Sequence, residues 1–392
     1  MNGAMTRGRI VSVRVFRPRI PFRLRFSHHQ ADRRESRPVV LEIALDDGTK
    51  GFGEAQPRAY VTGETEASVL EAVQGELARW LIAQEVPELG VAAALLAGDH
   101  AGRLREAMPA AFCAVDLALL DAAGKQSGRS AAEVLGDIRS LVHRSDGAVV
   151  GIMAPAALRL FAARLATRRL RWVKAKVGDA GDAFRVGELR RTLGPEVELV
   201  LDANGAWTRT QAVARIRELS RFGVAAVEQP VAREDLEGLG EVGSRTGVPV
   251  VADESLCTRG DAMSLLRHDG PVQWNVRDGK CGGLIGAIEL LRLAEAHAVV
   301  CHLGVMVGET ALLRAAGRLL AACTPALDRV ESDEGALLAR DLARSTGSAP
   351  LAPLDVSPGP GLAVEVDPEA LGPPCWTLDH PGQEPRDVLA TA

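Results

Sequence analysis

Three neighbouring runs of the 392-residue chain decide the fold: VELVLDAN at residues 197–204, VAAVEQP at 224–230 and VPVVADES at 248–255. Each is a short apolar, β-branched stretch that closes with a carboxylate, and each is followed by a longer stretch with helical periodicity. A buried strand that returns through a helix to the next strand is the unit of a parallel sheet. The three runs therefore predict consecutive βα units whose strands all end in an acidic side chain.

The same alternation recurs along most of the chain. A short β-branched run is followed by an amphipathic stretch, and parallel strands need such helices to return the chain. We therefore predict an α/β fold built on a parallel (β/α) barrel. A doubly wound open sheet is the alternative, but no GxGxxG motif opens any unit. The eight runs are AVVGIMA (148–154), WVKAKVG (172–178), VELVLDAN (197–204), VAAVEQP (224–230), VPVVADES (248–255), PVQWNVR (271–277), AVVCHLG (298–304) and RVESDEG (329–335).

A smaller part precedes the barrel. Residues 10–53 alternate apolar and basic residues and contain a DDG turn between two strand patterns, and residues 66–104 carry helical periodicity. We predict an α+β capping domain over residues 1–104 and the barrel over 105–344. The segment 345–392, with its APLAPLDVSPGPGLAVEV stretch, is expected to pack back on the capping domain.

The composition is typical of a globular protein, with 47% hydrophobic and 25% charged residues. The net charge of −5 and the scattered Lys and Arg residues lack the basic footprint of a nucleic-acid binder. No run of about 18 apolar residues occurs, so we expect no membrane partner. The six cysteines form no CxxC pair, which is typical of a reducing cytoplasm. We expect a cytoplasmic protein whose partners are small molecules.

Carboxylates close the third, fourth and fifth strand patterns at Asp202, Glu228 and Asp253. Because the active site of a parallel barrel lies where the strands end, the three side chains should converge. At about 4 Å, three ionised carboxylates would repel by roughly 4 kcal/mol per pair at a dielectric near 20, so a cation should lie between them. Oxygen ligands on a rigid frame favour Mg²⁺, or Mn²⁺, over Zn²⁺. A lone Asp at a strand end is otherwise typical of a helix N-cap.

Lysines follow two strands on opposite sides of the predicted barrel. Lys174 and Lys176 lie at positions i and i+2 of the second strand, so both point to one side of the wall. We predict that this side is the interior; the alternative is an outward position between helices. Lys280 follows the sixth strand. Beside a cation and away from water, one lysine can act as a general base and its partner across the cavity as the acid.

Taken together, these motifs resemble the muconate-lactonising subgroup of the enolase superfamily (mandelate racemase/muconate lactonizing enzyme). The resemblance rests on KxK, DxN, EQP and DES at four successive strands and on the lysine before CGG. It extends to GFGEA at 51–55, DLALLDAAGK at 116–125 and PGLAVEV at 360–366. It implies a modified TIM-type barrel, (β/α)7β, with an N-terminal capping domain, a homo-oligomer and an enediolate mechanism in which Mg²⁺ assists a basic residue.

The resemblance also implies roles for individual residues. The Mg²⁺ ligands would be Asp202, Glu228 and Asp253, and the acid/base pair would be Lys176 and Lys280. Lys174 would support the substrate carboxylate, Asn204 and Glu254 would hold the ligands in place, and Glu309 would lie beside the substrate. One extra residue between Met306 and Glu309 departs from the usual spacing of the family.

Several further positions have two interpretations. Asp278 with His302 could form an Asp–His base in place of Lys280, as in the mandelate racemase subgroup. His28, in SHHQADRRES, and Tyr60, in PRAYVTGET, are predicted to reach the substrate from lid loops, and a solvated loop is the alternative for His28. Ser332 and Asp333 could bind a substrate amine, as in dipeptide epimerases, or cap a helix.

Two lysines on opposite faces of one carbon are what a racemase or epimerase needs. We therefore predict proton removal and return α to the carboxylate of an amino-acid-like or dipeptide-like acid. The same frame supports a muconate-type cycloisomerase, or a dehydrating lyase of the o-succinylbenzoate synthase or acid-sugar dehydratase type, because each reaction passes through an enolate. A non-catalytic metal-binding barrel is the alternative of a different class.

Overall fold

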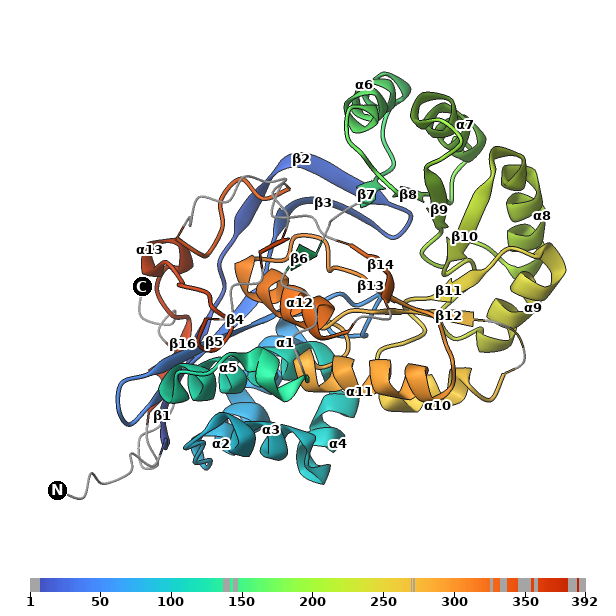
Figure 1. The fold of residues 1–392 in the computed structure, drawn as a ribbon. Helices are drawn as coiled ribbons and strands as arrows, with labels where there is room; N and C mark the ends of the chain where they lie inside the picture. The colour runs from blue at the N-terminus through green and yellow to red at the C-terminus, as the bar shows by residue number, and fades with distance from the viewer. Residues whose placement is uncertain are drawn as a thin grey trace.

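The computed structural model describes residues 8–136, 142–143, 147–268, 270, 272–324, 327–331, 337–344, 354–355, 359–379 and 386–387. Within these ranges the chain forms an eight-stranded parallel sheet surrounded by helices and a five-stranded antiparallel sheet beside it (Figure 1). No helix in the described ranges is long and apolar enough to cross a membrane.

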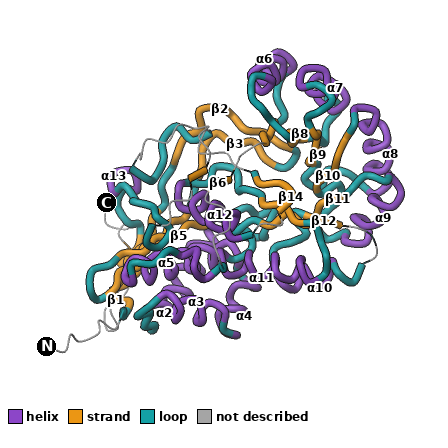
Figure 2. The backbone as a smooth tube through the Cα atoms, in the orientation of Figure 1, coloured by secondary structure: helices purple, strands orange, loops and turns teal. Residues whose placement is uncertain are grey.

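The parallel sheet is the predicted barrel. Its strands run in chain order from β7 to β14, so every neighbour is joined through a crossover helix, and β7 and β14 stand at the two edges. In Figure 2 the helices lie outside the strands they connect. The modified (β/α)7β fold is confirmed. The strands are β7 (Gly147–Val150), β8 (Trp172–Lys176), β9 (Glu198–Asp202), β10 (Val224–Glu228), β11 (Val250–Ala252), β12 (Val272–Val276), β13 (Cys301–Leu303) and β14 (Leu327–Val330).

Seven helices return the chain between these strands, and several begin with a capping residue. Thr208 and Thr258 each accept a hydrogen bond from the N3 backbone amide and form capping boxes. The helices are α6 (Pro155–Ala166), α7 (Asp182–Leu193), α8 (Arg209–Leu219), α9 (Leu236–Thr246), α10 (Arg259–Leu265), α11 (Gly283–Ala296) and α12 (Ala311–Cys323).

The strand register brings the predicted site residues to one level. Lys176 on β8 is paired with Asp202 on β9, and Asp202 is paired with Glu228 on β10. Since parallel strands that end in register present their last side chains at the same height, three functional side chains lie side by side at the carboxyl end of the barrel.

The antiparallel sheet has the order β17-β16-β1-β4-β5 and packs on the long helix α5 (Pro109–Ser127). Two glycines of the GFGEA motif explain this close packing. A Cβ atom on Gly51 or Gly53 would lie 2.2 Å or 1.9 Å from a backbone oxygen of α5. The strands are β1 (Ile10–Phe16), β4 (Val39–Leu45), β5 (Lys50–Ala55), β16 (Trp376–Asp379) and β17 (Arg386–Asp387).

A hairpin of β2 (Ile20–His28) and β3 (Ala31–Ser36) extends from this sheet to the barrel beside β7 and β8 (Figure 1). The amide of Ile152 donates to the Ser27 carbonyl at 2.9 Å, which ties the hairpin to the loop after β7. The remaining described elements are α1 (Glu66–Ala72), a π-helical turn (Val73–Leu77), α2 (Ala78–Ile82), α3 (Leu89–Ala97), α4 (Asp99–Ala107), 3₁₀ turns (Ala131–Val134, Ser220–Phe222), α13 (Pro368–Leu371) and the pair β6 (Val142–His143) with β15 (Leu354–Asp355).

One continuous hydrophobic core joins the two sheets. It runs from Ile10 and Leu41 of the antiparallel sheet through Phe112 on α5 to Leu284 on α11 and Leu312 on α12. Helix α5 packs on β4, β5 and α11, so it lies between the antiparallel sheet and the barrel. The division at residues 104 and 344 stays a prediction.

Candidate active site

The three predicted acids lie together at the carboxyl end of the barrel. One oxygen each of Asp202, Glu228 and Asp253 falls within a group whose members all lie within 4.8 Å of one another, and all three side chains are buried. They come from three neighbouring strands, as the sequence predicts. Burial of three like charges is costly unless opposite charges surround them, and four cationic side chains do so.

Lys174 and Lys176 point into the barrel from β8. Lys174 Nζ lies 2.5 Å from Glu228 Oε2 and also pairs with Glu331. Lys176 Nζ donates to Asp202 Oδ2 at 2.5 Å and to Asn204 Oδ1 at 3.1 Å. Burial alone would lower the pKa of Lys176, but the Asp202 carboxylate and its neighbours raise it overall. Both lysines are therefore held as ammonium ions by the acids.

Lys280 lies beside Asp253, at the end of the acid cluster away from Lys176. It is fully buried, and its Nζ donates to the carbonyls of Asp253 and Leu256, each at 2.5 Å, and lies 3.2 Å from Asp253 Oδ1. Burial favours a lower pKa for Lys280, yet the Asp253 charge raises it overall. Lys176 thus contacts the acid on β9 and Lys280 the acid after β11, with Glu228 between them.

Two side chains that the sequence analysis missed complete this cluster. Asn275 Nδ2 donates to Glu228 Oε1 at 3.0 Å, and Arg277 bridges Glu228, at 3.2 Å, and Asp253. Both follow the inward alternation of β12, at positions i and i+2. That alternation is the signal that could have identified them, because the same rule was used for the lysines on β8.

Asn204 and Glu254, which were predicted to hold the ligands in place, contact each other, and Asn204 also contacts Lys176. Asn204 Nδ2 donates to Glu254 Oε1 at 2.9 Å, and burial, followed by the charges of Asp253 and Asp202, raises the pKa of Glu254 to about 8. Gln229, quoted only as part of EQP, accepts hydrogen bonds from the amides of Asp253 at 3.0 Å and Ser255 at 3.1 Å. Gln229 therefore fixes the backbone that carries the third acid.

Glu309 is buried in the loop between β13 and α12, and its carboxylate accepts a hydrogen bond from the Met306 amide. The capping sheet holds this loop on both sides of Glu309. Gln56 Nε2 donates to the Gly308 carbonyl at 2.9 Å, and Glu54 accepts hydrogen bonds from the Thr310 amide and hydroxyl at 3.1 Å and 2.5 Å. The extra residue before Glu309 thus lies in a loop that the capping sheet positions.

The predicted lid residues meet over the barrel. His28 Nε2 lies 3.2 Å from the Tyr60 hydroxyl, and the rings form an edge-on pair. Tyr60 packs on a small apolar cluster of Val61, Cys257 and Met306, which joins the second lid loop to two barrel loops. Burial and then the nearby charge of Lys176 lower the pKa of His28 to about 3.

The Asp278–His302 alternative finds no support in the geometry. His302 Nε2 is 2.8 Å from Gln273 Oε1 and Nδ1 is 3.6 Å from Asp328, whereas Asp278 accepts from the Gly279 amide. The second Asp278 oxygen has no hydrogen-bond partner among the described residues. Ser332 and Asp333 lie outside the described residues. Their neighbour Glu331 is described and pairs with Lys174.

The acid cluster fits a divalent cation. Its donor atoms are all carboxylate oxygens within 4.8 Å, and Asp253 Oδ1 has an ion pair with Lys280 Nζ at 3.2 Å but no hydrogen bond in the described part of the chain. Carboxylate oxygens gathered in this way are the ligands that divalent cations such as Mg²⁺ prefer. Asp202, Glu228 and Asp253 are therefore the residues that could hold a metal ion.

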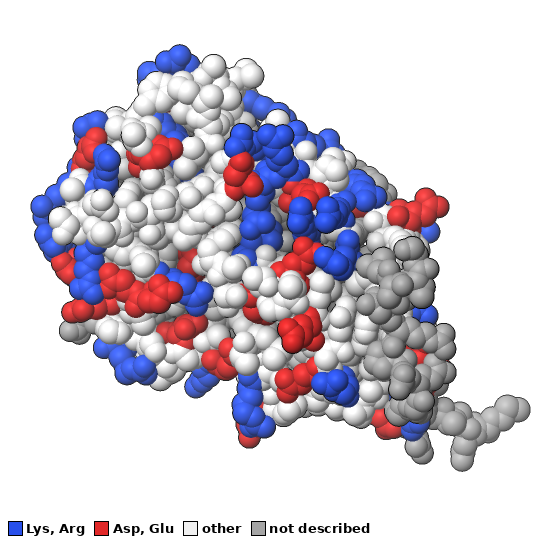
Figure 3. All heavy atoms as spheres, turned by 180° about the vertical axis from the view of Figure 1, so that it is seen from behind, with Lys and Arg blue, Asp and Glu red and all other residues white. Residues whose placement is uncertain are grey.

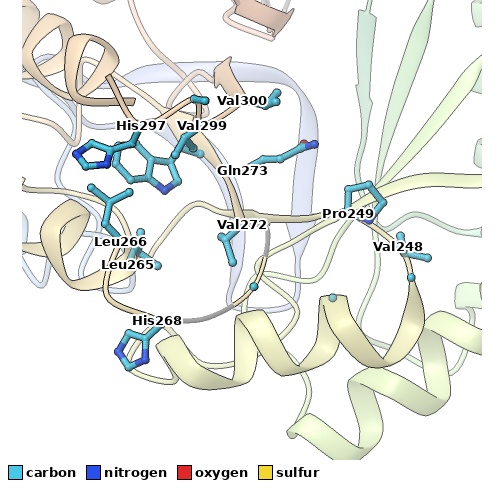
Figure 4. A pocket seen from close by; sticks show the side chains of 15 residues that line it. Val248, Pro249, Leu265, Leu266, His268, Val272, Gln273, His297, Val299 and Val300 are labelled. Carbon is cyan, nitrogen blue, oxygen red and sulfur yellow. The ribbon is translucent and has the colours of Figure 1, made fainter. Parts of the chain in front are cut away.

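A hollow of about 460 Å³ lies elsewhere, where β11, β12 and β13 begin (Figure 4). Its lining is largely apolar, with Val248, Leu265 and Val300 beside His268 and His297. It opens at the end of the strands opposite to the acids, so it is separate from the candidate active site. On the face seen in Figure 3, basic and acidic side chains are interspersed.

Family models match both parts of the chain. The mandelate racemase/muconate lactonizing enzyme N-terminal domain matches residues 10–136, and the enolase C-terminal domain-like family matches residues 157–370. The chain therefore belongs to the enolase superfamily, and within it to the mandelate racemase/muconate lactonizing enzyme subgroup.

Among similar curated proteins is the hydrophobic dipeptide epimerase of Enterococcus faecalis, which is 31% identical over 75% of this chain and 82% of that protein. The L-Ala-D/L-Glu epimerase of Bacillus subtilis is 31% identical over 78% of this chain and 82% of its own length. A solved structure of the Enterococcus faecalis dipeptide epimerase, complexed with Mg and L-Leu-L-Tyr, has a TM-score of 0.79 and 28% identity, covering 91% of this chain and 99% of that one. The chain is accordingly an enzyme of the isomerase class within this superfamily.

Proposed function

We propose that this enzyme is a Mg²⁺-dependent racemase or epimerase that removes and returns the proton α to the carboxylate of an amino-acid-like or dipeptide-like acid. The observation that carries the proposal is the buried cage of Asp202, Glu228 and Asp253, with Lys176 at its β9 end and Lys280 at its β11 end. Two amines that reach one cavity from different strands can serve the two faces of one carbon.

Mg²⁺ would be held by Asp202, Glu228 and Asp253. When bound, it supplies positive charge beside the substrate carboxylate, where negative charge accumulates as the α-proton leaves. The relatives support this choice of metal and substrate, because one of them was solved with Mg and a dipeptide. Mn²⁺ would suit the same oxygen ligands.

The chain's own residues would move the proton. Lys176 and Lys280 are ammonium ions beside their acids, so either can act as the general acid as it stands. The lysine that acts as base must first lose its proton. Since the neutral fraction of a lysine grows with pH, turnover should increase from neutral towards alkaline pH.

Further residues would bind and orient the substrate. Lys174 would support its carboxylate, and His28 and Tyr60 would enclose it from the capping domain. Glu309, Ser332 and Asp333 are proposed as contacts on the barrel side. The predicted homo-oligomer and cytoplasmic location also stay proposals.

The direct test is incubation of the purified enzyme and MgCl₂ with a library of L,L-dipeptides and N-acylated L-amino acids in D₂O. Mass spectrometry and ¹H NMR would follow the α-hydrogen. We expect deuterium at one α-carbon together with appearance of the other epimer, and loss of both with EDTA. Products that lack water, or lactones, would instead assign a lyase or a cycloisomerase. No exchange with any carboxylate in the library would contradict the proposal.

A further inference from the structure

Arg277 holds an unusual position in the acid cage. Each of the three lysines ion-pairs with only one of the three acids. Arg277 is the one cation in the described part of the chain that ion-pairs with two of them, Glu228 and Asp253. Its guanidinium therefore occupies the space where two of the proposed ligands face each other.

The surrounding backbone is shaped for this side chain. Asn275 and Arg277 leave β12 on its inward side and both contact Glu228 Oε1, at 3.0 Å and 3.2 Å. Across from them is Gly304, where an added Cβ atom would lie 2.4 Å from Asn275 Oδ1 and 2.8 Å from Arg277 Nε. A side chain at 304 would force Asn275, Arg277 or both to shift, so a glycine at this position leaves room for both side chains.

A guanidinium and a divalent cation make conflicting demands on the same carboxylates. Arginine stays charged at all ordinary pH values, so it cannot yield by losing a proton. A cation that coordinates Glu228 and Asp253 must either displace the guanidinium or share the two carboxylates with it at close range, and like charges repel strongly in a buried site. When no metal ion is bound, the charge of Arg277 offsets the repulsion between these two acids and keeps them together.

We propose that Arg277 is a built-in counter-ion that competes with the divalent cation for Glu228 and Asp253. It holds the empty cage in shape and keeps the affinity for Mg²⁺ below the value that the acids alone would give. The inference rests on the proposed function, in which the three acids bind Mg²⁺. It makes Arg277 a positioning residue whose effect is seen in metal binding itself.

The test is calorimetric titration of EDTA-treated full-length protein with MgCl₂ at constant ionic strength, comparing wild type with Arg277→Gln. We expect Mg²⁺ to bind Arg277→Gln at least about tenfold more tightly than the wild type. In EDTA this variant should melt at a lower temperature than the wild type, and added Mg²⁺ should raise its melting temperature by more. A matched control is Arg329→Gln, because Arg329 is a partly buried barrel arginine that pairs with Glu198 and Asp328 and with none of the three acids. Its affinity for Mg²⁺ should equal that of the wild type.

Arg277→Lys tests the same idea if the glutamine variant does not fold, since a lysine keeps the charge but cannot bridge two carboxylates as a planar fork. It should bind Mg²⁺ more tightly than the wild type. If the wild type binds Mg²⁺ and neither variant at Arg277 binds it more tightly, the competition is refuted while the proposed function stands. If no variant and no wild-type protein binds Mg²⁺, the metal cage and the proposed function both fail.

Discussion

Asn204 links the first acid, an amine and a supporting carboxylate. Its backbone lies at φ 44°, in the left-handed region that asparagine tolerates better than most residues. That conformation turns the side chain so that it accepts from Lys176 and donates to Glu254. The DxN motif is thus explained by backbone shape as well as by chemistry.

Asn204→Ala should lower kcat/KM by about 10- to 100-fold and the free energy of unfolding by about 1–2 kcal/mol, because Lys176 loses a partner and alanine is strained at this φ. Steady-state kinetics and urea unfolding would measure the two effects. Asn204→Gly is the control, since glycine removes the side chain without the strain. Full activity in the glycine variant would show that the hydrogen bonds of Asn204 do not matter.

His28 should make the stability depend on pH. Burial, assisted by the charge of Lys176, lowers the pKa of His28 from 6.5 to about 3. The Gln30 amide donates to Nδ1, so the neutral ring carries its hydrogen on Nε2, facing Tyr60. A histidine whose folded pKa is depressed stabilises the protein above pH 6.5, and this contribution is lost as the pH falls from 6.5 towards 3.

His28→Gln should therefore be less sensitive to acid than the wild type. Between pH 7 and pH 4 the wild type should lose on the order of 2–3 kcal/mol more than the variant. Denaturant unfolding of both proteins at each pH would measure the difference. Parallel pH curves for the two proteins would contradict the buried, neutral state of His28.

The sequence predicted which acids would lie together, because their place at a strand end determines their position. Asp202, Glu228 and Asp253 were found because each closes a strand of the same sheet. Arg277 was not singled out, because nothing in the local sequence shows that its side chain reaches across the neighbouring strand β11 to Glu228 on β10. The alternation along β12 predicts that this side chain points inward, whereas its partners depend on how the strands are arranged in the sheet.

The element that carries Glu309 is held by the capping sheet. Glu54, from β5, is fully buried and accepts hydrogen bonds from Gln56 and from Thr310, the residue that caps α12. Gln56 and Ser36 both donate to the Gly308 carbonyl, at 2.9 Å and 2.6 Å. The two parts of the molecule are thus joined at the loop between β13 and α12.

Glu54→Ala should cost about 2–4 kcal/mol in the free energy of unfolding. Four donors would lose a buried acceptor, namely the Gln56 side chain, the Thr310 amide and hydroxyl, and the Leu313 amide. Hydrogen exchange of residues 306–313 should rise at the same time. Glu42→Ala, in the adjacent strand β4, is the control, since Glu42 pairs with the partly exposed Arg14 and Lys50 and should cost less than about 1 kcal/mol. Equal losses in the two variants would argue against a special role for Glu54.

At the scale of elements, the sequence predicted eight strands and their helices because each unit repeats the same periodicity. It did not predict that Gly51 and Gly53 allow α5 to lie directly on β5. Close approach of a helix to a strand depends on which elements become neighbours, and this is decided by the tertiary fold. The GFGEA motif was therefore noted as a family resemblance without its physical reason.

At the scale of the whole molecule, the proposed active site lies between the barrel and the capping part, which share one hydrophobic core. The barrel supplies the acids and the amines. The capping part supplies His28, Tyr60 and the hydrogen bonds that hold the loop of Glu309. The hydrophobic core continues from the antiparallel sheet through α5 into α11 and α12, so the lid is attached to a rigid base. The fold class was predictable from sequence, whereas the contacts of the lid depend on how the two parts pack.

In the proposed mechanism, Lys176 and Lys280 exchange the α-proton from opposite faces of one carbon. Removing one of two such bases should abolish epimerisation and leave α-hydrogen washout from only one of the two epimers. The decisive measurement is washout in D₂O, by ¹H NMR, for each epimer of a dipeptide substrate with Lys176→Gln and with Lys280→Gln. We predict that each variant exchanges one epimer only and that the two variants exchange opposite epimers. Washout of both epimers at the wild-type rate in either variant would contradict the assignment of the two lysines to opposite faces of the α-carbon.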